Sequence, residues 1–257
     1  MRGIVIMKTE MIKGKKMPYI CTPLVGKNKE EIMKELEIIL PKKPDLLEWR
    51  VDFLEEISNL NYVLSTAEDI SAMSDLPLLF TIRSEKEGGE KISLSEEEKV
   101  FLLSEVCKSK AVDIIDFEVS NDPRHIKSLR KISRENEKKL VLSYHNFDFT
   151  PDNSEIMKRL FMAEFYGADI AKAAVMPKSK EDVLRLLALT KEADDSLDIP
   201  VITMSMGSLG GLSRIIGWTY GSIVTFGLGV QSSAPGQIPI DKLKKMIELT
   251  QDSLGDW

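Results

Sequence analysis

The stretch GADIAKAAVMP, residues 167–177, places a charged side chain inside a short apolar run. Alanines flank Lys172 on both sides, and the run ends at Pro177. A continuous apolar run of this length is typical of a parallel strand that is covered on both faces. Because burying an unpaired ammonium group is costly, this lysine requires either a carboxylate partner or a chemical use.

Seven other apolar runs rich in β-forming residues recur along the chain. With the run around Lys172, they predict strands over 18–25, 46–53, 77–83, 113–119, 139–147, 169–176, 200–207 and 222–229. Most of these runs are almost continuously apolar, as is expected of parallel strands between two layers of helices. The strand pattern is therefore that of an α/β protein with a parallel sheet.

Helix-start patterns lie between the predicted strands. Asn28, Ser95 and Ser179 are candidate N-caps, and each is followed three residues later by an acidic residue. Pro123 suits a first helical turn, and Gly167 suits the left-handed end of a helix. Strand–helix alternation repeated eight times predicts a (β/α)₈ TIM barrel, with an open doubly wound sheet as the structural alternative.

The chain shows no internal division. No linker or low-complexity tract interrupts it, so residues 1–257 are predicted to form a single barrel domain, with the barrel itself over about 18–250. Residues 1–17, with KGKK as a turn, are predicted to form an N-terminal extension and β-hairpin that closes the barrel floor. The residues before Met7 fit either the native chain or a tag or misplaced start.

The bulk composition excludes several classes of function. A formal net charge of −6 argues against a nucleic-acid surface, which needs a basic stripe, and leaves a small-molecule ligand as the expectation. The apolar stretch at the N-terminus is too short for a signal peptide or a membrane span, so a cytoplasmic location is predicted. Two cysteines and two histidines, without metal-ligand spacing, predict neither a disulfide nor a metal site.

Polar side chains gather on one face of several predicted strands. By strand alternation, Glu48, Arg50 and Asp52 share a face, and so do Asp116 and Glu118. The other candidates on or next to strands are Arg83, His145, Lys172, Met204 and Met206. Most lie in the carboxyl-terminal halves of their strands, which meet at the end of a barrel where active sites are built. We therefore expect these side chains to share one pocket.

Each candidate also has a purely structural interpretation. Lys172 also fits a pair with a carboxylate, and His145 fits a hydrogen-bonded core histidine. Met204 and Met206 fit ordinary packing, and Glu48 with Arg50 fits an ion-pair network beneath the pocket. For Asp52, Asp116 and Glu118 a supporting role is the favoured interpretation.

A chemical use for the lysine follows from its setting. An amine that is partly desolvated and close to other cations is expected to be partly neutral at pH 7. A neutral amine adds to a ketone and forms a Schiff base, whose iminium draws electrons from the adjacent carbon. A base must then remove a proton beside that carbon, and His145 is the suitable imidazole.

At these residues the sequence resembles the type I 3-dehydroquinate dehydratase family, the Schiff-base enzymes of the shikimate pathway. The resemblance runs from about residue 18 to 250 and rests on separated motifs in one order. These are LEWRVD, FTIRSEKEGGE, SYHNFDFTP, GADIAKAAVMP, ITMSMGSLGGLSR and SSAPGQ.

The resemblance implies a role for three catalytic residues. Lys172 would form the imine with the C3 ketone of 3-dehydroquinate. His145 would take a proton from C2 and then protonate the departing C1 hydroxyl. Glu87 would orient His145 and favour its charged form. The products would be 3-dehydroshikimate and water, without a metal or organic cofactor.

The resemblance also assigns the substrate-binding residues. Arg214, Ser233 and Gln237 would hold the substrate carboxylate, and Arg214 offers the fork geometry that suits one. The ring hydroxyls would be bound by Glu48, Arg50 and Arg83, and the pocket wall would consist of Met204, Met206, Phe226 and Ala234. A Gly-, Ser- and Pro-containing loop, GVQSSAPGQ, follows the eighth strand and is suited to close over the substrate.

Two other functions compete with this one. A class I Schiff-base aldolase uses a strand lysine on the same fold, but the last loop contains Pro235, which has no N–H for a phosphate. A catalytically inactive barrel that serves as a binding module is the second alternative, and the presence of Lys172, His145 and Arg214 argues against it. The family resemblance also implies a homodimer.

Overall fold

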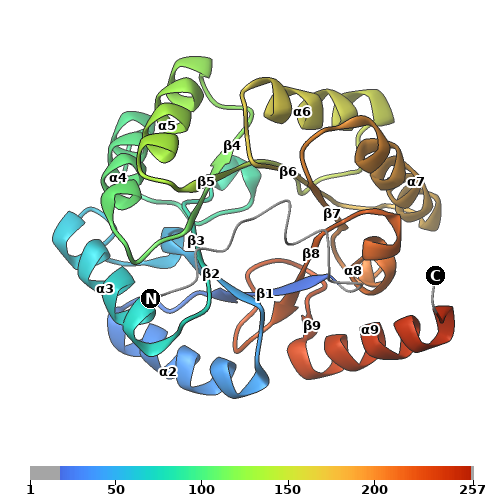
Figure 1. Cartoon of the computed structure of the whole chain (residues 1–257), viewed down its shortest axis with the longest axis horizontal. Helices are drawn as coiled ribbons and strands as arrows, with labels where there is room; N and C mark the ends of the chain where they lie inside the picture. The colour runs from blue at the N-terminus through green and yellow to red at the C-terminus, as the bar shows by residue number, and fades with distance from the viewer. Residues whose placement is uncertain (1–17, 256–257) are drawn as a thin grey trace.

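The computed structural model describes residues 18–255, and the hairpin predicted over residues 1–17 lies outside this range. The described chain forms one curled parallel sheet surrounded by helices (Figure 1). Its strands are β1 (Tyr19–Leu24), β2 (Leu46–Arg50), β3 (Leu78–Thr81), β4 (Ile114–Glu118), β5 (Lys139–Asn146), β6 (Ile170–Val175), β7 (Val201–Ser205), β8 (Val224–Leu228) and β9 (Ile238–Pro239). All eight predicted strands are therefore confirmed, and β9 is an additional short one.

The strand order is β7-β6-β5-β4-β3-β2-β1-β8-β9, and every pairing is parallel. Strand β7 also approaches β8 from its other side. The amide of Ile223, next to β8, donates a hydrogen bond of 3.0 Å to the carbonyl of Val201, and Val201 forms a parallel bridge with Ser222. The sheet therefore curls until β7, at one end of the strand order, lies beside β8, near the other end.

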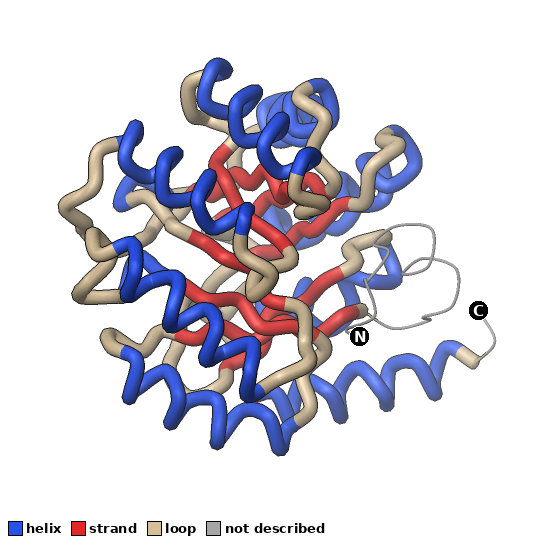
Figure 2. Tube along the Cα trace, turned by 60° about the vertical axis from the view of Figure 1, so that its left-hand side comes forward, coloured by secondary structure: helices blue, strands red, loops and turns tan. Residues whose placement is uncertain are grey.

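Helices cover the outside of the curled sheet, as the tube view shows (Figure 2). They are α2 (Lys29–Ile39), α3 (Leu60–Met73), α4 (Glu96–Lys108), α5 (Pro123–Glu135), α6 (Asn153–Phe165), α7 (Lys180–Ser196), α8 (Gly211–Ile216) and α9 (Ile240–Leu254). Each connects consecutive strands or follows the last one, which is the crossover arrangement that parallel strands require.

The predicted helix signals act as expected. The side chain of Asn28 accepts a hydrogen bond from the amide of Glu31, and complete capping boxes begin α4 at Ser95 and α7 at Ser179. Such caps stabilise a helix by about 1 kcal/mol each, because they satisfy amides that the first turn leaves free. Gly167 adopts a φ of 77° just after α6, so it ends that helix in the left-handed region.

The apolar core has two layers. The larger lies between the sheet and the helices, where Trp49 and Phe80 are fully buried and pack edge to face at 5.4 Å. The smaller lies inside the curl and includes Ile114, Val141 and Ile170, each among the first three residues of its strand. Because successive strand residues alternate between the layers, the inward positions further along the strands hold polar side chains together with apolar ones such as Met204 and Phe226.

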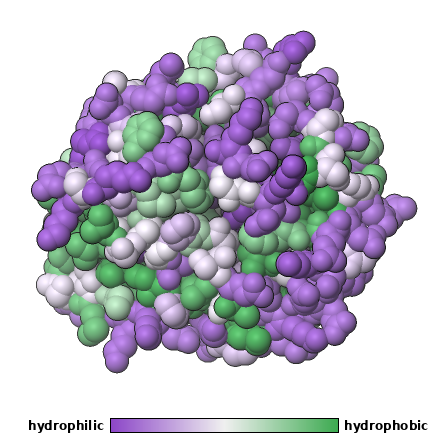
Figure 3. Space-filling view, turned by 180° about the vertical axis from the view of Figure 1, so that it is seen from behind, coloured by the Kyte–Doolittle hydropathy of each residue, from purple (hydrophilic) through white to green (hydrophobic). Residues whose placement is uncertain are grey.

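The surface is mainly hydrophilic. Seen from the side opposite to Figure 1, apolar residues form scattered groups among hydrophilic ones (Figure 3). Single exposed apolar side chains are normal for a folded chain. Among the described residues, no helix combines the length and the apolar character needed to cross a membrane.

Candidate active site

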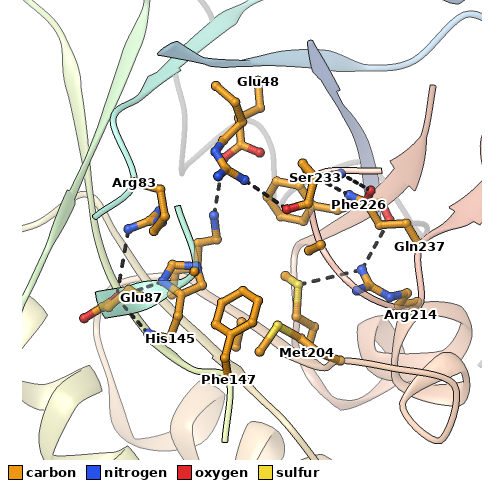
Figure 4. A pocket seen from close by; sticks show the side chains of 16 residues that line it. Glu48, Arg83, Glu87, His145, Phe147, Met204, Arg214, Phe226, Ser233 and Gln237 are labelled. Atoms are coloured by element: carbon orange, nitrogen blue, oxygen red, sulfur yellow. Dashed lines mark hydrogen bonds and ion pairs between the residues drawn. The ribbon is translucent and has the colours of Figure 1, made fainter. Parts of the chain in front are cut away.

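One pocket lies at the carboxyl ends of the strands, with an empty volume of about 430 Å³ (Figure 4). Every candidate catalytic or binding residue named from the sequence lines it. These are Glu48, Arg50, Arg83, Glu87, His145, Lys172, Met204, Met206, Arg214, Phe226, Ser233, Ala234 and Gln237. Three lining residues were missed: Gly88, Phe147 and Ala174. Strand position pointed to Glu48, Arg50, Arg83, His145, Lys172, Met204 and Met206, whereas the family resemblance supplied Glu87, Arg214, Phe226, Ser233, Ala234 and Gln237.

Lys172 is the central cation of this pocket. Its side chain is 5% exposed, and its Nζ lies 3.5 Å from Glu48 Oε1 and 3.4 Å from Asp116 Oδ2. The ring centroid of Phe226 is 4.5 Å from the same nitrogen. The sequence predicted cations around this amine, whereas the charged groups within 4 Å of it in the described residues are both carboxylates. Two of the interpretations made from the sequence therefore hold together: the lysine faces carboxylates and also lines a pocket.

His145 and Glu87 form a close pair on one side of the pocket. Glu87 Oε2 lies 2.9 Å from His145 Nδ1 and also accepts the His145 backbone amide at 2.9 Å. Burial lowers the pKa of His145 well below its ordinary value, and the cations Arg83 and Lys172 lower it further. Burial also raises the pKa of Glu87 to about 8, with a further contribution from the Glu118 carboxylate. The empty pocket therefore disfavours charge on both members of the pair.

The pair can exist in two protonation states with different chemistry. With Glu87 protonated, its proton fills the bridge to Nδ1 and the imidazole proton is left on Nε2. Once Glu87 has lost its proton, Nδ1–H fills the bridge, and Nε2 presents a lone pair. Only the second state offers a base at Nε2. Burial opposes a positive charge on the resting imidazole. Glu87 therefore stabilises that charge only once Nε2 has taken up a proton during the reaction.

The loop that carries Glu87 depends on two glycines. Glu87 ends the short 3₁₀ helix η3 (Glu85–Glu87), and Gly88 follows with a φ of 84°. A Cβ on Gly88 would lie 2.2 Å from the ring of Phe147, and one on Gly89 would lie 2.1 Å from the carbonyl oxygen of Arg83. The pair of glycines in the EKEGGEK run therefore brings this loop against the end of β3 and places the Glu87 carboxylate at the histidine.

A buried network of charges underlies the pocket on the same side. Arg83 donates to Asp116 Oδ1 at 2.7 Å, to Glu118 Oε1 at 3.1 Å and to Ser143 Oγ at 2.9 Å. Ser143 itself donates to Asp116 Oδ1 at 2.6 Å. The structure therefore places Asp116 and Glu118 as partners of a cation, in line with the supporting role that the sequence favoured for them.

Arg50 is held in a similar way by its neighbour Asp52. Its Nε and Nη2 donate to the two oxygens of Asp52 at 2.8 and 2.7 Å, while Nη1 donates to the carbonyl of Ser233 at 3.1 Å. Asp52 also accepts the backbone amides of Arg83 and Glu90 at 3.2 Å each. This carboxylate thus fixes Arg50 at the pocket and joins it to the loop that carries Glu87.

Arg214 lies across the pocket from His145 and Glu87 (Figure 4). It is 1% exposed and donates to the carbonyls of Phe226 at 3.3 Å and Pro235 at 3.0 Å, but no carboxylate among the described residues forms an ion pair with it. Its buried Nε has no hydrogen-bond partner in that part of the chain. Burial lowers the pKa of this guanidinium to about 10. A buried cation without an anion is costly, so this site is suited to an anionic ligand.

The loop after β8 closes this side. The Gln237 side chain accepts the Ser233 amide at 3.0 Å and donates to Ser233 Oγ at 3.1 Å. Gly236 has a φ of 77°, and a Cβ there would lie 2.2 Å from the carbonyl oxygen of Gly207. Through Arg50 and Arg214, two cations of the pocket hold carbonyls of this loop.

The described residues contain no cluster of three or more His, Cys, Asp or Glu side chains that could hold a metal ion. The apolar lining, formed by Phe147, Met204, Met206 and Phe226, surrounds the polar groups on the inner face. The pocket therefore combines a lysine facing carboxylates, a histidine–carboxylate pair and an unpaired guanidinium. This is the combination expected for acid–base chemistry on a carbonyl compound that carries a carboxylate.

The family model described as type I 3-dehydroquinase matches residues 20–253. The chain belongs to the type I 3-dehydroquinase family. A 3-dehydroquinate dehydratase of Albidiferax ferrireducens is 50% identical over 246 residues, which cover 95% of this chain and 93% of that protein.

Solved structures of type I 3-dehydroquinases and related dehydratases agree. The crystal structure of 3-dehydroquinate dehydratase from Geobacillus kaustophilus has a TM-score of 0.91 and 47% identity, and the match covers 93% of each chain. The type I 3-dehydroquinate dehydratase from Clostridium difficile, solved with covalently modified comenic acid, has a TM-score of 0.89 and 39% identity. That match covers 93% of this chain and 95% of the other.

Proposed function

We propose that this chain is a 3-dehydroquinate dehydratase that acts through a Schiff base on Lys172. The observation that carries the proposal is that two buried cations lie in one pocket: the amine of Lys172 and the guanidinium of Arg214, which has no carboxylate partner in the described part of the chain. A substrate with a ketone and a carboxylate complements both. 3-Dehydroquinate has both groups, and proteins of the family are named for it.

The covalent step conserves charge at the lysine nitrogen. The amine lone pair attacks the C3 carbonyl, the resulting carbinolamine loses water, and a C=N bond replaces C=O. Overall, an ammonium and a ketone become an iminium and one water, so the nitrogen carries one positive charge before and after the step. The iminium then acts as an electron sink for the bond to hydrogen at C2.

His145 handles the protons of the elimination. In the state with Nε2 free, it removes the C2 proton, and the electron pair moves into the iminium to give a neutral enamine. The resulting imidazolium is stabilised by the Glu87 carboxylate at 2.9 Å and returns the proton to the departing C1 hydroxyl. The enamine electrons form the new C=C bond, the iminium is regenerated, and water releases the product.

The other lining residues bind and enclose the substrate. Arg214, with Ser233 and Gln237, holds the carboxylate, while Glu48, Arg50 and Arg83 contact the ring hydroxyls. The apolar wall of Met204, Met206, Phe226 and Ala234 excludes water that would otherwise hydrolyse the imine. The loop after β8 serves as the lid over the substrate, because it carries the pocket-lining residues Ser233 and Gln237.

Three further features belong to the same proposal. The curled sheet is a closed (β/α)₈ barrel in which β7 and β8 are neighbours, as the hydrogen bond from Ile223 to Val201 supports. The protein is cytoplasmic. It assembles as a homodimer, which light scattering after size-exclusion chromatography tests directly.

Reductive trapping tests the proposal. Incubation with 3-dehydroquinate and borohydride should add one substrate-derived group to the protein, on the peptide that contains Lys172. Lys172→Ala should stay folded, because the barrel does not depend on this amine, and circular dichroism checks this. The variant should take up no label. Equal labelling of both proteins, or no labelling of the native one, would refute the assignment.

A further inference from the structure

Asp116 contacts the reacting nitrogen without lining the pocket. Its Oδ2 lies 3.4 Å from Lys172 Nζ, and the carboxylate is 1% exposed. Glu48, the other carboxylate near this nitrogen, does line the pocket, where a substrate can engage it. Asp116 does not line the pocket, so a substrate that fills the pocket has no direct access to this carboxylate.

We propose that Asp116 is the permanent counter-ion of the lysine nitrogen and keeps the Schiff base of Lys172 in its charged, iminium form. This inference rests on the proposed function, because it concerns the imine that the function requires. Only a charged iminium is a strong electron sink, so a group that retains the proton on this nitrogen decides how well C2 is activated.

The surroundings of Asp116 keep it ionised. Burial acts to raise its pKa, but Arg83 and Lys172 outweigh burial, and the pKa of Asp116 is lowered. Arg83 donates to Oδ1 at 2.7 Å, and Ser143, on β5, donates to the same oxygen at 2.6 Å. The second oxygen, Oδ2, is therefore left to face the lysine nitrogen on β6.

The other charges nearby divide into two groups. Glu48 on β2 reaches the nitrogen itself, at 3.5 Å. Glu118 on β4 and Glu87 on η3 approach Arg83 instead, at 3.1 and 4.0 Å. Asp116 is thus the carboxylate that touches both cations. The hydrogen bond from Arg83 partly neutralises the Asp116 carboxylate and so weakens its attraction to the lysine nitrogen. The iminium therefore remains able to accept electrons from C2.

The contact at 3.4 Å also explains why the charge can persist through the covalent step. Ammonium and iminium both carry one positive charge on the same nitrogen, so one fixed anion suits both. The ring of Phe226, 4.5 Å from Nζ, favours a cation there as well. The environment is matched to a nitrogen that stays positive on both sides of imine formation.

Asp116→Asn tests the proposal. The asparagine oxygen can still accept from Arg83 and Ser143, so the network loses its charge but keeps these hydrogen bonds. An opposite charge at this distance shifts a titration by about 1 to 3 pH units. We therefore expect the alkaline limb of the kcat profile to move down by about 1 to 3 pH units, because the iminium becomes a neutral imine at lower pH.

A measurement that does not depend on turnover accompanies it. Cyanoborohydride reduces the charged iminium in preference to the neutral imine, so the yield of the adduct with 3-dehydroquinate, followed by mass spectrometry, should fall at a lower pH in Asp116→Asn than in the native protein. If this variant does not fold, Asp116→Ser leaves room for water in place of the carboxylate and is measured in the same way.

Glu118→Gln is the matched control. It removes a carboxylate from the same strand and from Arg83, but within the described chain this residue forms no hydrogen bond or ion pair with the lysine nitrogen. Its alkaline limb should stay with that of the native protein. Coinciding limbs in native and Asp116→Asn protein, or an equal shift in Glu118→Gln, would overturn the counter-ion role. Absence of any adduct in the native protein would instead overturn the proposed function.

Discussion

Arg214 shows how a binding site can oppose the stability of the fold. Within residues 18–255, the hydrogen bonds of this fully buried guanidinium reach only backbone carbonyls and a methionine sulfur, so it has lost hydration without gaining an anion there. Burial lowers its pKa to about 10, well below the ordinary value of a guanidinium, which corresponds to a cost of about 3 kcal/mol in the empty protein. If a substrate carboxylate binds there, as proposed, it offsets that cost, and the energy regained contributes to binding.

Replacing this arginine should separate stability from function. We expect Arg214→Met to raise the melting temperature while raising KM by about 10- to 100-fold, since a charged hydrogen bond is worth about 1.5 to 3 kcal/mol. Thermal unfolding and steady-state kinetics measure the two effects. Arg124→Met, at an exposed arginine paired with Asp122, is the control and should change neither strongly. An unchanged KM in Arg214→Met would show that the substrate carboxylate does not bind at this arginine.

The histidine–carboxylate pair predicts a pH dependence with a definite sign. Nε2 of His145 becomes a base only when Glu87 has lost the bridging proton, and the pKa of Glu87 is about 8. We therefore expect kcat/KM to rise as the pH increases through about 8. In Glu87→Gln the amide oxygen accepts Nδ1–H at every pH, so the acid limb should move to lower pH. Identical acid limbs in the two proteins would contradict this assignment.

Removal of the imidazole itself should cost more than removal of its partner. We expect His145→Ala to lower kcat by about 10²- to 10⁴-fold, the range for a lost general acid–base group. The imine should still form on Lys172, so borohydride trapping should still label the variant with substrate. Steady-state kinetics measures the loss of turnover, and mass spectrometry measures the labelling. Near-normal turnover would exclude His145 from the proton transfers.

At the scale of single elements, much of the site could be predicted because strand alternation is a short-range rule. Glu48 and Arg50 on β2, or Met204 on β7, face inward for the same reason as every second residue of their strands. Phe147 and Gly88 were missed because they meet across two loops, and no periodicity in the sequence relates them. The two carboxylates at Lys172 come from β2 and β4, so their distances follow from the curl of the whole sheet.

The loop after β8 offers a test of the lid. A side chain on Gly236 would collide with the carbonyl of Gly207 and would also be strained at a φ of 77°. We expect Gly236→Ala to displace Ser233 and Gln237 and to raise KM at least several-fold, measured by initial rates. Gly255 has a φ of 65° but no neighbour within 4 Å, so Gly255→Ala is the matched control for backbone strain alone. Equal effects of the two changes would argue against a lid at Gly236.

For the molecule as a whole, the sequence predicted eight strands with correct order and approximate bounds, because continuous apolar runs and helix caps are local signals. It did not predict β9, a pairing of two residues that the sequence marks with no apolar run. It also predicted cations around Lys172, whereas the nearest charges are carboxylates. Whether a buried side chain meets positive or negative charge depends on which strands become neighbours, and that is a property of the whole curled sheet.

The unpaired guanidinium also makes the stability of the whole molecule depend on ligand. A ligand that binds only the folded state at 100 times its Kd stabilises it by about 2.7 kcal/mol. For a domain of this size, that raises the melting temperature by about 5 to 10 °C. We expect quinate, which has the carboxylate and hydroxyls but no ketone, to produce such a shift in the native protein and in Lys172→Ala, as measured by differential scanning calorimetry. Arg214→Met should start from a higher melting temperature and respond less, because the cations left in its pocket, Lys172, Arg50 and Arg83, already have carboxylate partners.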